Sequence, residues 1–211
     1  MKNIIVLVSG GGTNLQALID AEERGEIKGG RITCVISSKE GAYALERAAK
    51  HGIKGITLPR KDYPDNRAYS EALLGILKSE NADVVVYAGF MTILDECVCN
   101  AYPYKMVNVH PALIPSFCGK GFYGLRVHEE VLKRGVKVTG ATVHFVTADC
   151  DGGPIILQRA VYIEEGDTPE ILQRRVMEQV EWKILPEAVS LLCEDRIEVK
   201  DNITHIKERI V

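Results

Sequence analysis

The sequence predicts an α/β protein with a doubly wound, mostly parallel sheet and a small C-terminal hairpin. Strand and helix patterns alternate over the first two-thirds of the chain, which is typical of parallel sheets with right-handed crossovers. The first predicted strand, Ile4–Val8, is a continuous apolar run, as expected of a strand buried on both faces. A glycine-rich turn follows it and leads into a helical pattern that begins at Leu15.

The other predicted strands are β-rich runs bounded by breaking or polar residues. They lie at Arg31–Ile36, Ile56–Leu58, Asp83–Ala88, Lys105–Val109, Val138–Val146 and Ile155–Ile163. Asp195–Lys207 is predicted as a terminal hairpin that turns at Asp201 and Asn202.

Helices are predicted where apolar residues recur at helical spacing or where good helix formers gather before a glycine. They run from Leu15 to Gly25, over Ala42–Lys50, along the face of Tyr69, Leu73, Leu74 and Leu77, over Val127–Arg134, and over about 168–193. Since no linker, repeat or low-complexity tract interrupts the pattern, the prediction is one domain, residues 1–211, with a Rossmann-like N-terminal half.

The composition excludes several classes of protein. The 211 residues are 46% hydrophobic and 26% charged, which is ordinary for a folded domain. The 26 Lys+Arg against 29 Asp+Glu give a net charge of −3, so the basic excess of a nucleic-acid-binding protein is absent. No apolar run approaches the roughly 20 residues that span a bilayer. Ile4–Val8 is too short for the core of a signal peptide, so we predict a cytoplasmic protein.

The six cysteines are scattered, which in a cytoplasmic chain predicts free thiols. Only Cys97 and Cys99 are close in sequence, and they lack the second pair or nearby histidine that would complete a tetrahedral zinc site. The sequence therefore predicts no metal.

Ligands of open α/β sheets bind beyond the carboxyl ends of the strands, where the turn at residues 9–14 is predicted to lie. This turn is not a dinucleotide fingerprint, because Leu15 replaces the third glycine and Ser37-Ser38 replace the acidic residue that holds the ribose. Its glycines instead favour the binding of one phosphate by backbone N–H groups at a helix start. A plain tight turn is the alternative interpretation.

Asn108 and His110 end another predicted strand and lie on the same face of it. A later turn brings the acidic residues Asp149 and Asp151 to the same edge. An amide, an imidazole and a carboxylate together predict acyl-type transfer, in which the Asn holds a developing oxyanion, the His moves a proton and an Asp tunes the His. Nothing in the sequence activates Cys118 or Cys150 as a nucleophile. A structural histidine and a simple Asp-Gly-Gly-Pro bend remain the alternatives.

Five segments resemble the phosphoribosylglycinamide formyltransferase family in its order and spacing, over about residues 1–193. They are SGGGTNLQ (9–16), AGFM (88–91), NVHPALIPSF (108–117), TGATVHFV (139–146) and DGGPIILQ (151–158). The resemblance implies the formyltransferase fold and a role in purine biosynthesis. It implies transfer of a formyl group from 10-formyltetrahydrofolate, a cosubstrate, to the glycine amine of glycinamide ribonucleotide, without a covalent enzyme intermediate.

The resemblance also implies the site residues. Asn108, His110 and Asp151 match the catalytic trio, in which a nearby carboxylate is expected to raise the pKa of His110. Residues matching the ribonucleotide site are Gly12, Thr13, Asn14 and Glu181. Residues assigned to the folate pocket are Arg67 (with Asn66 as its alternative), Met91, Thr92, Ile93, Leu94, Asn108, Val143, Thr147, Ala148, Asp149, Cys150 and Asp151. A cis peptide bond is predicted before Pro115.

This assignment divides the domain into a phosphate-binding half (about 1–100), a catalytic and folate half (about 101–193) and a terminal extension (194–211). The chain departs from the family pattern at Thr92, where arginine is usual, and at Trp182, where histidine is common. One additional residue precedes Glu181. These departures affect contacts with folate and ribonucleotide and leave the trio intact.

Four other functions fit the sequence less well. A methionyl-tRNA formyltransferase is expected to carry a further C-terminal domain and a basic surface, whereas the net charge here is −3. A formyltetrahydrofolate hydrolase is expected to carry a further N-terminal domain, whereas Met1 lies three residues from the first strand. Leu15 and Ser37-Ser38 disfavour a nicotinamide oxidoreductase. A non-catalytic nucleotide-binding module is disfavoured by the intact trio. A monomer or a homodimer is expected.

Overall fold

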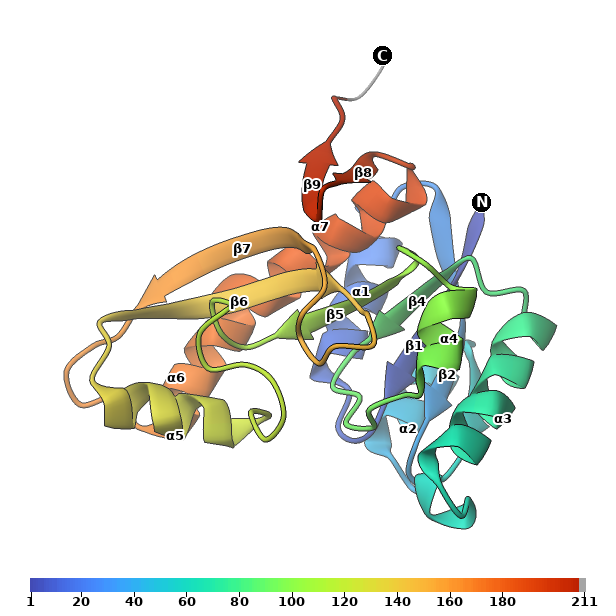
Figure 1. The fold of residues 1–211 in the computed structure, drawn as a ribbon, viewed down its shortest axis with the longest axis horizontal. Coiled ribbons are helices and arrows are strands. Elements are labelled where there is room, and N and C mark those ends of the chain that lie inside the picture. The colour runs from blue at the N-terminus through green and yellow to red at the C-terminus, as the bar shows by residue number, and fades with distance from the viewer. Residues whose placement is uncertain (209–211) are drawn as a thin grey trace.

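Seven strands form one sheet in the computed structural model, which describes residues 1–208 (Figure 1). Their order across the sheet is β3-β2-β1-β4-β5-β6-β7. The strands are β1 (Lys2–Val8), β2 (Gly30–Ser37), β3 (Lys54–Thr57), β4 (Val84–Tyr87), β5 (Met106–His110), β6 (Val138–Phe145) and β7 (Ile155–Tyr162). Neighbours from β3 to β5 are parallel, and β6 and β7 are antiparallel additions. The predicted mostly parallel sheet is confirmed.

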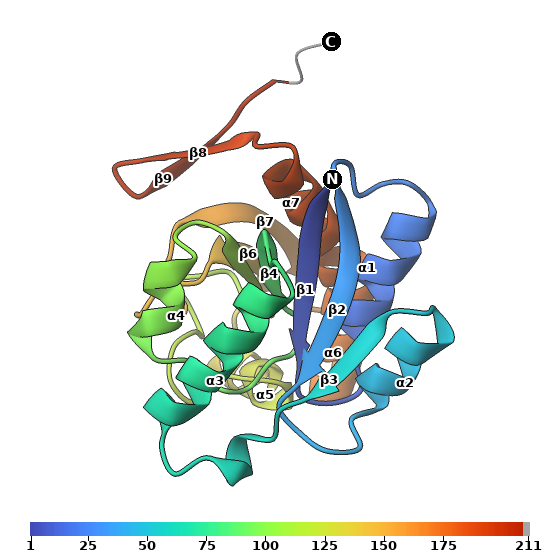
Figure 2. The same ribbon diagram turned by 90° about the vertical axis from the view of Figure 1, so that its right-hand side faces the viewer.

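Helices cover both faces of the sheet, as Figure 2 shows for the β1–β2 region. On one face lie α1 (Thr13–Glu23), α2 (Tyr43–Lys50), α5 (Leu125–Arg134), α6 (Pro169–Val176) and α7 (Trp182–Cys193). The other face is covered by α3 (Asn66–Ser79) and α4 (Glu96–Ala101), and a 3₁₀ turn, η1 (Arg60–Asp62), precedes α3.

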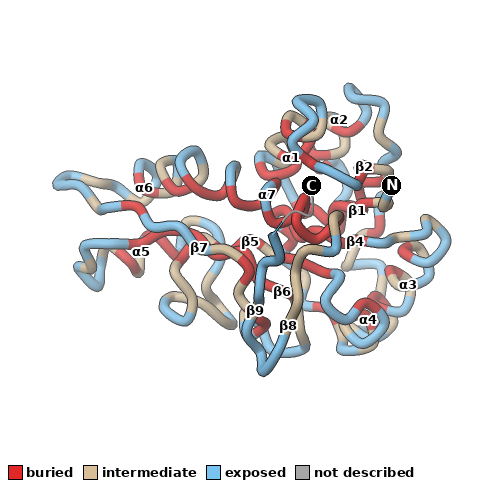
Figure 3. Tube along the Cα trace, turned by 90° about the horizontal axis from the view of Figure 1, so that it is seen from above, coloured by how far each residue is buried: buried red, intermediate tan, exposed pale blue. Residues whose placement is uncertain are grey.

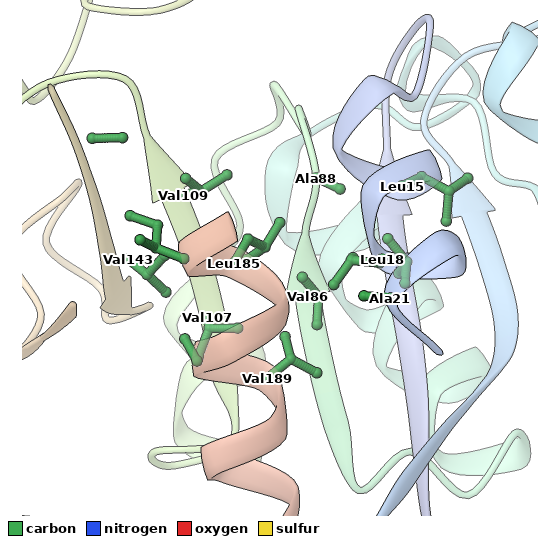
Figure 4. Close-up of a cluster of buried hydrophobic side chains, with 14 of the residues drawn as sticks. Leu15, Leu18, Ala21, Val86, Ala88, Val107, Val109, Val143, Leu185 and Val189 are labelled. Carbon is green, nitrogen blue, oxygen red and sulfur yellow. The ribbon is translucent and has the colours of Figure 1, made fainter. Parts of the chain in front are cut away.

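The apolar run of β1 is continuous because each face of this strand meets a separate core. Ile4, Val6 and Val8 point into the larger core, whereas Ile5 and Leu7 point into the smaller one. The central strands are accordingly buried along their length (Figure 3). In the larger core, side chains of α1 and α7 pack on β4 and β5 (Figure 4). Burial of both faces holds the strand ends, and therefore the loops that follow them, in fixed positions.

Two helical features were not predicted in this form. The short helix α4 has no apolar period of its own, and it begins where the Asp95 carboxylate accepts a hydrogen bond from the Cys97 N–H. The run predicted over about 168–193 is divided by a π-helical turn, η2 (Met177–Glu181), between α6 and α7. A π-helical turn accommodates one residue more than an α-helical turn. This turn lies where the sequence has an additional residue before Glu181.

The terminal hairpin is confirmed. It consists of β8 (Ile197–Lys200) and β9 (Ile203–Ile206), paired antiparallel as a separate sheet. Asp201 and Asn202 form its turn with φ of 50° and 63°, conformations that these two residue types tolerate. Residues 209–211 of the predicted terminal extension lie outside the described residues. No helix within residues 1–208 combines the length and the apolar character needed to cross a membrane.

Candidate active site

The loops that follow β1, β2 and β4 meet at the carboxyl edge of the parallel strands. The Ser9 hydroxyl, just after β1, lies 2.6 Å from the Ser38 hydroxyl after β2, and it accepts a hydrogen bond of 2.9 Å from the Met91 N–H after β4. His110 ends β5 at the same edge. The segments expected to form the site are therefore adjacent.

The glycine-rich turn is held from one side by α2. The Ala44 N–H donates to the Gly10 carbonyl at 3.1 Å, and the Arg47 Nε–H donates to the Gly11 carbonyl at 2.9 Å. Gly12, the N-cap residue just before α1, has a φ of 71° and no side chain, so the first N–H groups of that helix are free of a capping side chain. Arg47 lies 36 residues beyond Gly11 in sequence, so local sequence patterns do not predict this contact. This geometry suits an anion bound at the start of α1.

Asn14 and Glu181 join the first helix to the π-helical turn. The Asn14 side-chain NH₂ donates to the Glu181 carboxyl at 2.9 Å, and both residues are buried. Burial raises the pKa of Glu181 to about 7, although the hydrogen bond from Asn14 opposes this shift. Thr13 is exposed beside them, with its hydroxyl 4.0 Å from the Met177 sulfur. Of the predicted ribonucleotide residues, Gly12, Thr13 and Asn14 are thus consecutive at the start of α1, and Glu181 is hydrogen-bonded to Asn14.

The predicted catalytic trio is brought together by β5, β6 and the turn after β6. The His110 Nδ1 lies 3.7 Å from Asp151 Oδ2, and the Asn108 side-chain nitrogen lies 3.2 Å from the His144 Nε2. His144 Nε2 also lies 3.5 Å from Asp151 Oδ1, so His144 links the Asn to the Asp. Sequence reasoning missed His144. It pairs directly with Asn108 in the β5–β6 register, and the alternation of β6 was the available signal.

Glycines let the Asp151 turn fold back onto the end of β6. A Cβ atom on Gly153 would lie 1.9 Å from the Phe145 carbonyl oxygen, so only glycine fits there. The Phe145 N–H donates to the Pro154 carbonyl at 2.9 Å, and Asp151 itself has a φ of 54°. The turn therefore aims the Asp151 side chain at the two histidines, where it is 10% exposed.

Hydrogen bonds to carbonyl oxygens assign the tautomers of both histidines. His144 Nδ1–H donates to the Phe145 carbonyl at 2.8 Å, so its Nε2 accepts from the Asn108 NH₂. One amide hydrogen of Asn108 is then left for another acceptor. His110 Nε2–H donates to the Phe117 carbonyl at 2.8 Å, which leaves the lone pair of its Nδ1 on the Asp151 side.

The charge state of His110 differs from the expectation. Burial lowers the pKa of His110. The charge of Asp151 and the hydrogen bond to the Phe117 carbonyl raise that pKa, but burial has the larger effect, so the pKa lies below its ordinary value. Burial raises the pKa of Asp151, but His144, His110 and the Gly119 N–H together hold it below the ordinary value. At neutral pH the pair is a neutral imidazole beside a carboxylate.

The two cysteines near this cluster are not activated. Burial and the charge of Asp151 raise the pKa of both the Cys118 and the Cys150 thiols. A thiol with a raised pKa supplies little thiolate at neutral pH. Within residues 1–208, no three His, Cys, Asp or Glu side chains are grouped in a way that could hold a metal ion.

Comparison with known proteins shows the family of the chain. The chain matches the Formyl transferase family over residues 2–189. The phosphoribosylglycinamide formyltransferase of Escherichia coli (strain K12) is 39% identical over 200 residues, which covers 95% of this chain and 91% of that protein. The chain belongs to the phosphoribosylglycinamide formyltransferase family. The resemblance of the five sequence segments is confirmed.

This formyltransferase also matches longer proteins. The trifunctional purine biosynthetic protein adenosine-3 of Bos taurus is 42% identical over 199 residues, which are 94% of this chain and 19% of that protein. Among solved structures, the glycinamide ribonucleotide transformylase 1 of Symbiobacterium toebii has a TM-score of 0.92 at 42% identity, covering 99% of this chain and 95% of that one. A formyltetrahydrofolate deformylase of Pseudomonas syringae pv. tomato str. DC3000 has a TM-score of 0.87 at 29% identity, covering 98% and 66%.

Apolar side chains are exposed in the segment of the formyltransferase that follows β4, the strand paired with β5. Met91 is 46% exposed and Ile93 is 52% exposed, whereas Leu94 is buried. Exposed apolar groups at a strand edge are typical of a ligand-binding surface. Arg67, at the start of α3, forms ion pairs with Glu71 and with Asp95 next to this segment.

The remaining predicted folate residues divide into two groups. Thr147 to Cys150 lie in the partly exposed turn after β6, where the Thr147 hydroxyl donates to the Asp149 carbonyl at 3.2 Å. Val143 is fully buried in the larger core (Figure 4). Its side chain therefore lies on the opposite face of β6 from that of His144, the next residue of the strand. The structure does not bring Val143 together with the other folate residues, because successive strand side chains point to opposite faces. The peptide bond between Ile114 and Pro115 is cis, as predicted.

Proposed function

We propose that this formyltransferase transfers the formyl group of 10-formyltetrahydrofolate to the glycine amine of glycinamide ribonucleotide. The observation that carries the proposal is the cluster of Asn108, His110, His144 and Asp151 at the same strand edge as the glycine-rich turn. One group of residues is suited to acyl transfer, and the other is suited to a phosphate. The near full-length match to the phosphoribosylglycinamide formyltransferase of Escherichia coli (strain K12) supports the proposal.

In the proposed reaction the amine nitrogen attacks the formyl carbon, and a tetrahedral centre with a negative oxygen forms. The free amide hydrogen of Asn108 donates to that oxygen, while His144 holds the amide in orientation. The neutral His110 accepts a proton from the attacking nitrogen at Nδ1, and Asp151 stabilises the imidazolium that results. The bond from the formyl carbon to the folate nitrogen then breaks, and that nitrogen takes the proton from His110.

The acceptor is proposed to bind across the start of α1. Its phosphate would meet the N–H groups at the turn that ends in Gly12, with Thr13 and Asn14 beside it and Glu181 reaching the ribose or the amine. This arrangement uses the buried Asn14–Glu181 pair, which a protein acting on folate and water alone would not need. It therefore favours transfer to a ribonucleotide over hydrolysis.

Replacing Gly12 by Val is expected to weaken acceptor binding about tenfold or more, equivalent to about 1.4 kcal/mol, and to leave folate binding nearly unchanged. A Cβ at Gly12 would lie 2.7 Å from the Ala44 Cβ and 2.9 Å from its Cα, and the φ of 71° disfavours any side chain. Isothermal titration with each ligand measures the effect. Gly10→Ala is the matched control, because an added Cβ there meets nothing within 4 Å. Equal loss of both ligands would show that the turn is only structural.

The folate ring system is proposed to lie against Met91, Ile93 and Leu94, with Arg67 near its charged end. Thr92 lacks the charge of the family arginine, so this position is expected to act through its backbone. Thr92→Ala should therefore change the Kd of the folate cosubstrate by less than about tenfold, or 1.4 kcal/mol. Fluorescence titration checks this. A larger loss would show that the hydroxyl itself binds folate.

The second candidate is hydrolysis of 10-formyltetrahydrofolate, suggested by the similarity to a formyltetrahydrofolate deformylase. An assay of the purified protein with 10-formyltetrahydrofolate, in the presence and absence of glycinamide ribonucleotide, separates the two. Formylated ribonucleotide as the product supports transfer, whereas formate released at the same rate with and without the acceptor supports hydrolysis. The cytoplasmic location, the absence of metal and the monomeric or homodimeric state stay predictions.

A further inference from the structure

The segment between β5 and α5, residues 111–124, supplies two backbone groups to the catalytic cluster. The Phe117 carbonyl accepts a hydrogen bond from His110 Nε2 at 2.8 Å, and the Gly119 N–H donates to Asp151 Oδ2 at 2.8 Å. The segment contains no helix or strand that would fix these groups. Its position must therefore depend on contacts with the rest of the protein.

Two side chains from the antiparallel strands hold the beginning of this segment. The Thr142 hydroxyl donates to the Ala112 carbonyl at 2.7 Å and accepts from the Ile114 N–H at 3.1 Å. The Gln158 side-chain NH₂ donates to the Ile114 carbonyl at 2.9 Å and to the Thr142 hydroxyl at 2.9 Å. Thr142 and Gln158 are direct neighbours in the β6–β7 register, and Thr142 also pairs with His110 across β5–β6.

These contacts use the whole hydrogen-bonding capacity of both groups. A hydroxyl has one hydrogen to donate and two lone pairs, and all three are used at Thr142. Both hydrogens of the Gln158 NH₂ are also used. A Cβ on Gly140 would lie 2.0 Å from the Arg159 carbonyl oxygen of β7 and 2.9 Å from a methyl carbon of Leu113, so glycine there lets β7 and Leu113 both lie close to β6. Such a saturated network defines one position of the segment rather than several.

We propose that Thr142 and Gln158 are positioning residues for the catalytic step. They hold residues 112–114 against the sheet, and so determine where the Phe117 carbonyl meets His110 and where the Gly119 N–H meets Asp151. This inference rests on the proposed function, because it assigns His110 and Asp151 to formyl transfer. Thr142 and Gln158 themselves contact strand and loop groups rather than the reacting atoms. Their loss should therefore lower kcat while the KM values of both substrates change little.

The test compares Thr142→Val, which removes the hydroxyl at nearly constant shape, with Thr142→Ser, which keeps it. Thr142→Val is expected to lower kcat roughly 10- to 100-fold, the order of loss that follows when catalytic groups are displaced by about 1 Å. Thr142→Ser should restore most of the rate. Thr139→Val is the matched control, because Thr139 is buried on the same strand and its hydroxyl has no hydrogen-bond partner. It should turn over like the wild type.

Gln158→Leu provides a second arm that does not disturb the core, because Gln158 is exposed on the edge strand β7. It should also lower kcat without a matching rise in KM. Wild-type kcat in both Thr142→Val and Gln158→Leu would overturn the inference, as would KM values that rise by the same factor as kcat falls.

A nuclear magnetic resonance measurement separates this inference from the proposed function. The Nε2–H resonance of His110 reports its bond to the Phe117 carbonyl whether or not formyl transfer occurs. It should shift in Thr142→Val and Gln158→Leu and stay constant in Thr139→Val. A wild-type protein that does not formylate glycinamide ribonucleotide would overturn the proposed function. An unchanged His110 resonance in both variants would overturn the positioning role.

Discussion

Asp151→Asn is expected to keep the fold and the binding of both substrates while lowering kcat by about 10²- to 10⁴-fold, the range for loss of general acid–base catalysis. The Asp151 carboxylate lies 3.7 Å from the His110 nitrogen that carries the lone pair. In the proposed reaction that nitrogen takes a proton from the attacking amine, and the carboxylate stabilises the resulting charge. An amide in its place has no charge to offer, so the proton transfer becomes less favourable.

The same change should move the pH dependence in a defined direction. The charge of Asp151 raises the pKa of His110 against the effect of burial, so its removal lowers that pKa further. Because the proposed reaction uses the neutral imidazole, activity should be lost as pH falls through this pKa. The acid limb of kcat/KM should therefore shift to lower pH in Asp151→Asn. Steady-state kinetics between pH 5 and about 9, with the His110 titration followed by nuclear magnetic resonance, measures both effects.

Non-additivity provides the control for this prediction. His110→Ala should be as damaging as the double variant with Asp151→Asn, because residues that act as a unit do not contribute independently. Circular dichroism and folate binding should show that all three variants remain folded. Near-normal turnover in Asp151→Asn, or an unchanged His110 titration, would remove Asp151 from the mechanism.

Local sequence patterns were sufficient to predict most of the fold. The continuous apolar run of β1 indicated a strand between two cores, and the structure shows residues of β1 alternating between those cores. The short helix α4 was missed because its six residues carry no apolar period and depend on a cap from Asp95. The π-helical turn is invisible to periodicity, since it interrupts an otherwise regular helical pattern by a single residue.

The candidate site was predictable where side chains follow strand ends, and less so where it depends on tertiary contacts. Asn108 and His110 share a strand face, which the sequence shows directly. His144 joins them only through the antiparallel register of β5 and β6, and Arg47 reaches the glycine-rich turn from α2. The sequence predicts Val143 in the folate pocket, whereas alternation along β6 directs its side chain into the core.

The low pKa of His110 illustrates the same limit. A carboxylate near an imidazole predicts a raised pKa, and that contribution is present. Burial acts in the opposite direction and is larger, but the depth of burial depends on tertiary contacts such as the approach of the Phe117 carbonyl to the ring. The sequence alone does not give the burial of the His110 side chain. The balance between two opposing electrostatic effects therefore emerges only with the folded structure.

Glu181→Gln is expected to stabilise the protein at pH 8 while weakening the acceptor complex. Glu181 is 5% exposed, and burial raises its pKa to about 7 from an ordinary value of 4.5. Between these two values the folded state binds a proton that the unfolded state has released. The stability that this proton contributes is fully present below pH 4.5 and is lost as pH rises through 7. At pH 8 the folded protein therefore carries the cost of a buried carboxylate.

A glutamine keeps the shape and still accepts the hydrogen bond from Asn14, without the buried charge. The free energy of unfolding should rise by up to about 3 kcal/mol at pH 8 and change little at about pH 5. Urea denaturation at the two pH values measures this difference. Glu187→Gln is the matched control on the next helix, α7, because Glu187 is half-exposed and paired with Arg159, so its replacement should give no comparable gain.

Acceptor binding should respond in the opposite sense. A carboxylate that accepts hydrogen bonds from the ribonucleotide contributes about 1.5–3 kcal/mol, the usual range for hydrogen bonds to charged groups, so KM for glycinamide ribonucleotide should rise about 10- to 100-fold. In the wild type the same KM should fall as pH rises through 7, because the ionised form is the better acceptor. Glu181→Gln should abolish that dependence. If the variant gained stability and kept the wild-type KM at every pH, Glu181 would be a buried carboxyl without a part in binding, and the ribonucleotide would have to be held by the glycine-rich turn alone.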